Sequence, residues 1–133
     1  MKVLIMGCGR VGSRLARLLA GEGHDVTVID TSPRSFRRLG DGFRGRTVLG
    51  TGIDEDVLRQ AGAEDADIFV ATTEGDNRNI MAAQVAQKVF DVPTVVARVY
   101  DPGRSEVFDK LGIRTYCPTL EGARLLHEMI LEK

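Results

Sequence analysis

The chain alternates short apolar runs with segments of helical periodicity. Residues 2–7 (KVLIMG) form a continuous apolar run that ends in glycine, which is typical of a strand buried on both faces of a sheet. Five similar runs follow along the chain. The pattern therefore predicts six strands, at residues 2–7, 25–30, 46–50, 67–72, 94–99 and 113–117.

Helical periodicity fills the segments between the predicted strands. In the first of these helices Val11, Leu15, Leu18 and Leu19 share one face, which we expect to be buried. Asp54 stands at the N-cap position of a later helix. The remaining helices are predicted over residues 35–39, 79–90, 105–111 and 120–131.

Single helices between consecutive strands indicate right-handed crossovers and a parallel sheet. The prediction is an α/β fold with a doubly wound, Rossmann-like parallel sheet of six strands. The length of 133 residues suits a single domain, and no linker or low-complexity segment interrupts the pattern.

The charge balance argues against some classes of partner. The net charge is −1, so no overall basic field favours nucleic acid or anionic lipid. Basic and acidic residues are mixed along the chain, and Arg34, Arg37 and Arg38 beside Asp41 are typical of a solvated helix face.

Cysteine use and hydropathy suggest a compartment. Cys8 and Cys117 have no metal-binding spacing, and we see no secretory signal, so we expect a reducing cytosol. No apolar run is long enough to cross a bilayer, so we expect no direct membrane insertion and any membrane connection to run through a partner.

The segment MGCGRVG places a glycine-rich loop between the first strand and the first helix. Gly7 permits a sharp turn, Gly9 lets backbone approach a phosphate, and Gly12 lets the helix pack on the strand. The backbone of Cys8 and Val11 completes the loop. Unpaired amides at a helix start bind anions, so the segment predicts a phosphate site, the alternative being a turn without a ligand.

An acidic residue strengthens that prediction. Asp30 ends the second strand, where a carboxylate accepts both hydroxyls of an adenosine ribose; the alternative is a turn cap with Thr31 and Ser32. It would repel a 2′-phosphate, which disfavours NADP despite Arg34 nearby. Arg10 has the reach to bind a second or third phosphate, the alternative being an exposed arginine without a ligand. The predicted ligand is an adenine nucleotide, either NAD(H) or ATP/ADP.

Several segments together resemble a known family. They are GCGRVG with Arg10, VTVID with Asp30, GTGIDEDVLRQAGAEDADIFVATT, DNRN with Asp76 and Asn79, and VVARVYDP with Arg98. Across nearly all 133 residues the chain resembles the N-terminal nucleotide-binding domain of Trk-type potassium-uptake regulators, also called the KTN or RCK domain.

The resemblance implies a cytoplasmic regulatory subunit that lies on the inner face of the membrane through its partner. It would bind NAD(H) or ATP/ADP and gate an integral membrane potassium transporter or channel, as a homodimer that assembles into a ring. Arg10 would contact the β- or γ-phosphate, and Arg98 would add positive charge near the phosphates or the subunit interface. Thr72 and Thr73 would border the base or the distal part of the ligand. For the last three residues, strand-end solvation and helix entry are the alternatives.

The chain departs from the family pattern in two places. Thr51 stands where the family usually has an acidic residue, and Ile53 replaces a usual threonine, while Asp54 is retained. These residues, with Gly52, flank the expected base pocket. The chain also ends after its last helix, without the C-terminal lobe of many relatives, so we expect residues 1–133 to form the N-terminal domain alone.

An NAD-dependent oxidoreductase is the main alternative from another class, and a regulatory domain of a cation–proton antiporter is a second. Neither Tyr100 nor Tyr116 is followed by a lysine four residues later, and His24 and His127 are expected at the surface. A P-loop kinase is excluded because no lysine follows the glycines. We therefore expect no enzyme activity.

The last predicted helix has an apolar seam formed by Leu126, Met129 and Ile130. The seam packs either against a partner or against the core of its own domain.

Overall fold

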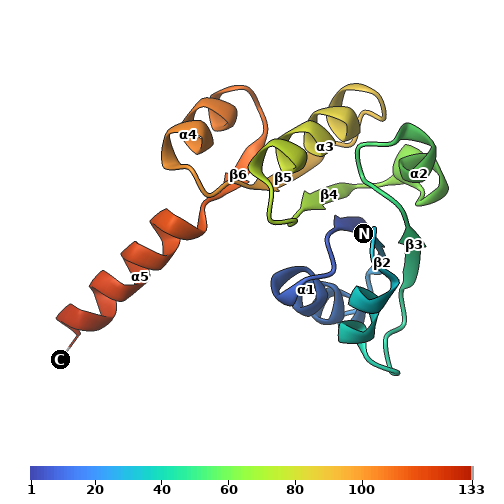
Figure 1. Cartoon of the computed structure of the whole chain (residues 1–133), viewed down its shortest axis with the longest axis horizontal. Coiled ribbons are helices and arrows are strands. Elements are labelled where there is room, and N and C mark those ends of the chain that lie inside the picture. Colours follow the sequence, from blue (N-terminus) through green and yellow to red (C-terminus); the bar gives the residue numbers. More distant parts are fainter. Residues whose placement is uncertain (133) are drawn as a thin grey trace.

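The computed structural model describes residues 1–132 and confirms the doubly wound α/β fold (Figure 1). Six parallel strands pair in the order β3-β2-β1-β4-β5-β6, so the strand order reverses between β1 and β4. The strands are β1 (Lys2–Met6), β2 (Asp25–Asp30), β3 (Arg46–Leu49), β4 (Ile68–Ala71), β5 (Thr94–Arg98) and β6 (Arg114–Tyr116).

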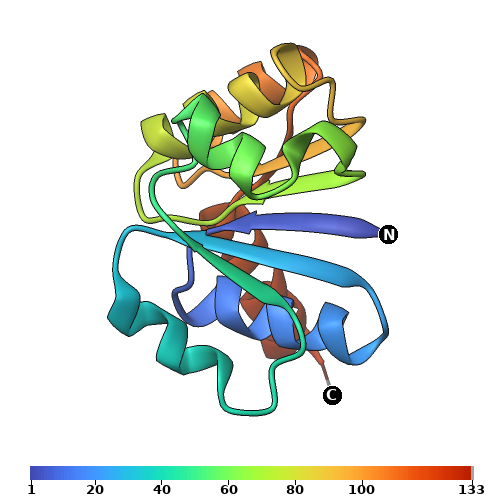
Figure 2. The same ribbon diagram turned by 90° about the vertical axis from the view of Figure 1, so that its right-hand side faces the viewer.

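Helices cover both faces of this sheet. Helix α1 and the 3₁₀ helix η1 lie on one face, whereas α2 and α3 lie on the other (Figure 2). The helices are α1 (Arg10–Gly21), η1 (Pro33–Leu39), α2 (Glu55–Gln60), η2 (Ala63–Asp65), α3 (Asp76–Lys88), α4 (Pro102–Lys110) and α5 (Pro118–Leu131).

Four helices, η1, α3, α4 and α5, begin two or three residues earlier than the sequence pattern predicts. Pro102 and Pro118 occupy the first turns of α4 and α5, where the missing N–H of proline costs no hydrogen bond. Helix α3 begins at Asp76. Asp76 Oδ1 accepts a hydrogen bond from the Tyr100 amide at 2.9 Å, which ties this helix start to the loop after β5.

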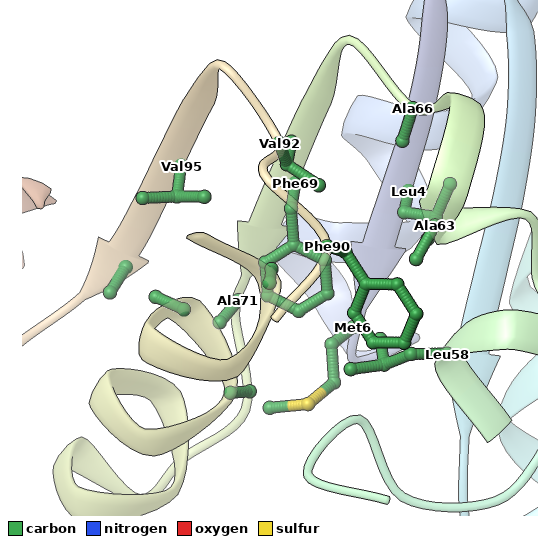
Figure 3. Close-up of a cluster of buried hydrophobic side chains, with 14 of the residues drawn as sticks. Leu4, Met6, Leu58, Ala63, Ala66, Phe69, Ala71, Phe90, Val92 and Val95 are labelled. Carbon is green, nitrogen blue, oxygen red and sulfur yellow. The ribbon is translucent and has the colours of Figure 1, made fainter. Parts of the chain in front are cut away.

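The core lies on both sides of β1, whose side chains alternate between the two faces. Leu4 and Met6 belong to the cluster under α2 and α3, with Phe69 at its centre (Figure 3). Val3 and Ile5 belong to the cluster under α1. Burial on both faces explains the continuous apolar run of this strand.

The buried face of α1 differs from the predicted one. Val11 and Leu18 are exposed, because the helix lies so close to the sheet that small residues fill the contact. The buried residues are Gly12, Ser13 and Ala16, flanked by the half-buried Leu15 and Leu19.

Helix α5 projects from the body of the fold (Figure 1). None of its residues is buried, and Leu126, Met129 and Ile130 are 60%, 59% and 79% exposed. Of the two alternatives for this seam, packing on the core of its own domain is therefore wrong. Among residues 1–132, no helix combines the length and the apolarity needed to cross a bilayer.

We predict that Gly12→Ala destabilises the fold, because a Cβ at this position would lie 1.9 Å from the Gly7 carbonyl oxygen. Backbone atoms cannot move aside as a flexible side chain can, so the free energy of unfolding should fall by about 2–3 kcal/mol or more. Gly21→Ala is the matched control on the same helix, since a Cβ there meets nothing within 4 Å. Urea unfolding of both variants measures the difference, and equal stability would contradict the tight α1 contact.

Candidate functional site

A cleft of about 760 Å³ lies at the carboxyl ends of the strands, where the strand order reverses. This is the position at which open α/β sheets bind ligands, and the volume suits a small organic molecule. The predicted site residues that line it are Gly7, Gly9, Arg10, Val11, Asp30, Thr31, Thr51, Gly52, Thr72, Thr73 and Arg98.

The glycine-rich loop forms the floor of the cleft. The Gly7 amide donates to the Ile29 carbonyl at 2.8 Å, and Gly7 has a φ of +105°, a conformation that favours glycine. Helix α1 starts after Gly9 with no side-chain cap and no acidic residue in its first turn. A Cβ on Gly9 would meet nothing within 4 Å, so this glycine borders open space in the cleft. Free amides and the helix dipole at an uncapped helix start favour anions, so this end of α1 is a candidate anion site.

The Asp30 carboxylate fastens the loop to the end of β2. Its Oδ2 accepts a hydrogen bond from the Cys8 amide at 2.8 Å, and its Oδ1 accepts one from the Ser32 amide at 2.8 Å. Asp30 thus caps the turn, as the alternative interpretation held, and also lines the cleft. Each carboxylate oxygen retains acceptor capacity, so both remain available to hydroxyl groups of a ligand.

The thiol of Cys8 is packed inside the loop. It is fully buried, and Sγ donates to the Ser35 carbonyl at 3.2 Å. Burial, and secondly the negative charge of Asp30, raise the pKa of the Cys8 thiol to about 11. At neutral pH the thiol is protonated, so its role in the loop is structural.

A hydrogen-bond network forms the opposite wall of the cleft. Thr72 Oγ1 donates to the Gly7 carbonyl at 3.2 Å, which joins the end of β4 to the loop. Arg98 Nη2 donates to the carbonyls of Thr72 and Thr73 at 2.6 and 3.0 Å. The Asn79 side chain accepts from the Thr73 amide at 2.9 Å and donates to the Arg98 carbonyl at 2.9 Å. Asn79 is fully buried and supports the cleft from behind.

Arg98 is a buried cation beside the cleft. It is 9% exposed, so the alternative of strand-end solvation is wrong. Within residues 1–132 no carboxylate lies within 4 Å of it, and its buried Nε has no hydrogen-bond partner. Its guanidinium lies 5.3 Å from the centre of the Tyr100 ring. A buried charge without a counterion is costly, so an anion in the cleft would stabilise this wall.

Some predicted site residues do not line the cleft. Asp54 caps α2 by accepting from the Asp56 amide at 2.8 Å, and Asp76 holds the loop after β5. Cys8, Gly12 and Asn79 position the loop, helix α1 and the wall.

The cleft also contains residues that the sequence reasoning missed. Arg78 is the third residue of α3 and Arg38 lies on η1; both helices follow strands whose carboxyl ends border the cleft. A signal existed for Arg78, because an arginine early in such a helix resembles Arg10 at the start of α1. Arg38 lies in the last turn of η1, so the prediction of a solvated helix face did not reveal that it also borders the cleft. The further lining residues are Met6, Ile29, Ser35, Gly50, Glu74 and Tyr100.

The charge of the cleft is positive. Four arginines line it, against the two carboxylates of Asp30 and Glu74. Among the described residues no group of three or more His, Cys, Asp or Glu side chains could hold a metal ion. The arrangement therefore suits an organic anion that carries hydroxyl groups for Asp30.

Comparison with known proteins agrees with this geometry. The sequence model of the TrkA-N domain matches residues 3–117. The chain belongs to the TrkA-N family. Trk system potassium uptake protein TrkA of Streptomyces coelicolor is 52% identical over 133 residues, which cover this whole chain and 58% of that protein. The chain thus spans somewhat over half the length of this relative.

Solved structures of the family share the fold. The TrkA-N domain of inner membrane protein ybaL from Escherichia coli has a TM-score of 0.87 and 25% identity, and covers 98% of this chain and 96% of that one. The Kef C-terminal domain of Shewanella denitrificans, solved in an AMP-bound form, has a TM-score of 0.83 and 26% identity, and covers 98% and 80%.

We predict that Cys8 makes stability depend on pH in the alkaline range. Its pKa is about 11 when folded, against an ordinary value of 9.0, so the folded state retains a proton that the unfolded chain releases. Stability should therefore fall as pH rises from about 9 to 11, by up to about 2–3 kcal/mol relative to Cys8→Ala. Urea unfolding of both proteins at several pH values checks this, and parallel pH profiles would contradict it.

Proposed function

We propose that the chain binds an adenine nucleotide, NAD(H) or ATP/ADP, in this cleft and regulates a membrane potassium transporter or channel. One observation carries the proposal: the uncapped start of α1 and the Asp30 carboxylate, a phosphate site and a ribose site, border the same cleft. The AMP-bound form of the related Kef domain and the TrkA relatives support it.

In the proposed pose the phosphates lie on the amides beside Gly9, and the ribose diol binds Asp30. Arg10 is exposed at the rim, where it reaches phosphates beyond the first. Thr51 and Gly52 border the base. The carboxylate would repel a 2′-phosphate, which disfavours NADP.

The proposed role is sensing rather than conversion. No histidine, lysine or cysteine is among the residues that line the described cleft, and Tyr100 has no lysine beside it. Proton transfer to or from a substrate needs a positioned acid or base. The carboxylates that line the described cleft are those of Asp30, which the proposal assigns to the ribose, and Glu74, so the oxidoreductase alternative has less support.

The proposed assembly is a homodimer that builds a ring on the cytoplasmic face of the membrane. Helix α5 supports it, because an apolar seam with no buried residue needs a partner. Nucleotide exchange would change the charge at the start of α1 and so bias the arrangement of paired domains.

Calorimetric titration with ATP, ADP, NAD and NADH tests the binding proposal. We expect Arg10→Ala to weaken ATP binding about tenfold or more and NAD binding much less, because a charge-assisted hydrogen bond to a terminal phosphate is lost. Arg14→Ala is the matched control, one turn along the same helix and outside the cleft. Absence of heat with all four nucleotides would refute the function, and equal weakening of ATP and NAD would refute the role of Arg10.

The assembly is tested by sedimentation at micromolar concentration. We expect a dimer for the unaltered chain and a monomer for the double variant Leu126→Glu, Ile130→Glu, since two charges in the seam cannot be buried without a counterion. Val107→Glu is the control, because Val107 is also apolar and 53% exposed but lies on α4. A monomeric unaltered chain would contradict the pairing.

A further inference from the structure

Charge is segregated in this molecule, contrary to the mixing expected from the sequence. Residues 1–46 contain nine lysine or arginine and four aspartate or glutamate residues, whereas the rest of the chain contains nine and fifteen. The first segment builds α1 and η1, which lie on one face of the sheet (Figure 2). The net charge of −1 is therefore the sum of a basic layer, which contains α1 and η1, and an acidic remainder of the molecule.

The basic layer presents an arginine surface, which we define as Arg14, Arg17, Arg34, Arg37 and Arg44. All five side chains belong to exposed residues. Within residues 1–132 none of them lies within 4 Å of a carboxylate. Arg17 of α1 and Arg44 of the loop after η1 line the same hollow, so the two elements share part of this surface.

Some arginines outside this surface are paired with carboxylates, whereas others within residues 1–132, such as Arg104 on α4 and Arg114 on β6, stand singly without one. Arg59 on α2 pairs with Asp56 and Glu64, and Arg124 on α5 pairs with Glu121 and Glu128. Like charges gathered without partners repel each other, so the arginine surface gains from any anion that binds it.

Exposed apolar side chains lie among these arginines. Leu18 is 61% exposed and follows Arg14 by one helical turn; Val11, at 42%, precedes it by almost one turn. These are the two residues that the sequence pattern wrongly placed in the core. Arginine next to exposed apolar residues on one helix is typical of a surface that enters the headgroup layer of a membrane.

We propose that the arginine surface docks on anionic phospholipid headgroups. The guanidinium group binds phosphate oxygens in pairs and suits such a layer, while Leu18 enters its apolar boundary. Duplex nucleic acid would also attract the charge, but it offers no site for an exposed leucine among the arginines. The five arginines and Leu18 do not line the nucleotide cleft, which uses Arg10, Val11 and Arg38, so the arginine surface does not depend on the proposed function.

Co-sedimentation of the full chain with lipid vesicles tests the proposal without nucleotide. We expect at least fivefold stronger binding to phosphatidylcholine vesicles containing about one third phosphatidylglycerol than to pure phosphatidylcholine. Binding should fall about tenfold between roughly 0.1 and 0.5 M salt, since screening shortens the reach of exposed charges. Equal binding to both vesicles, or no binding to either, overturns the proposal.

Two triple variants with the same net charge locate the surface. Arg14→Gln, Arg17→Gln, Arg37→Gln should weaken binding to the anionic vesicles at least fivefold. The control Arg59→Gln, Lys88→Gln, Lys110→Gln, on α2, α3 and α4, should bind within twofold of the unaltered chain. Equal losses in both variants overturn the proposal, as does tighter binding to duplex DNA than to the vesicles. Thermal unfolding of both variants verifies that they fold.

Discussion

Two hydrogen bonds to one carboxylate organise the site. Asp30 accepts the amide of Cys8 in the glycine-rich loop and the amide of Ser32 in the turn after β2. These two hydrogen bonds hold the loop without a ligand and fix the start of α1 relative to the end of β2. If these two ends are the proposed phosphate and ribose sites, their fixed separation would let the cleft bind a nucleotide without the cost of ordering a flexible loop.

Gly7 joins this arrangement to the other half of the sheet. Its amide donates to Ile29 on β2, and its carbonyl accepts from Thr72 at the end of β4. Arg98 donates a hydrogen bond to the Thr72 carbonyl, and no carboxylate among the described residues pairs with its guanidinium group. Gly7 thus contacts the ends of three strands, β1, β2 and β4, at the place where the strand order reverses. A side chain at Gly7 would meet Thr72 Oγ1 at 2.9 Å, so the junction excludes larger residues.

The sequence predicted the strands well because strands buried on both faces need continuous apolar runs, as at residues 2–7 and 25–30. It also predicted the loop and Asp30, whose spacing follows from the geometry of the first strand–helix–strand unit. It failed for α1, where large apolar residues were taken as the buried face. Only small residues fit where α1 touches the sheet at Gly12 and Ala16. Small residues also occur on exposed helix faces, so periodicity alone does not reveal that these are buried. Arg38 was missed because its approach to the cleft depends on how η1 packs, which is a tertiary property, whereas the position of Arg78 early in α3 is visible in the sequence.

Helix α1 connects the two charged regions of the molecule. Arg10 stands at its start beside the cleft, and Arg14 and Arg17 continue on its exposed side. Seven residues of helix separate Arg10 from Arg17, a rise of about 10 Å, which is close to the screening length at physiological salt. An anion on Arg10 therefore lowers the potential at Arg14 substantially and that at Arg17 only weakly. Any coupling between the cleft and the arginine surface should thus be strongest at low salt, and a triphosphate should exert it more than a doubly esterified pyrophosphate, because its greater charge extends toward Arg10.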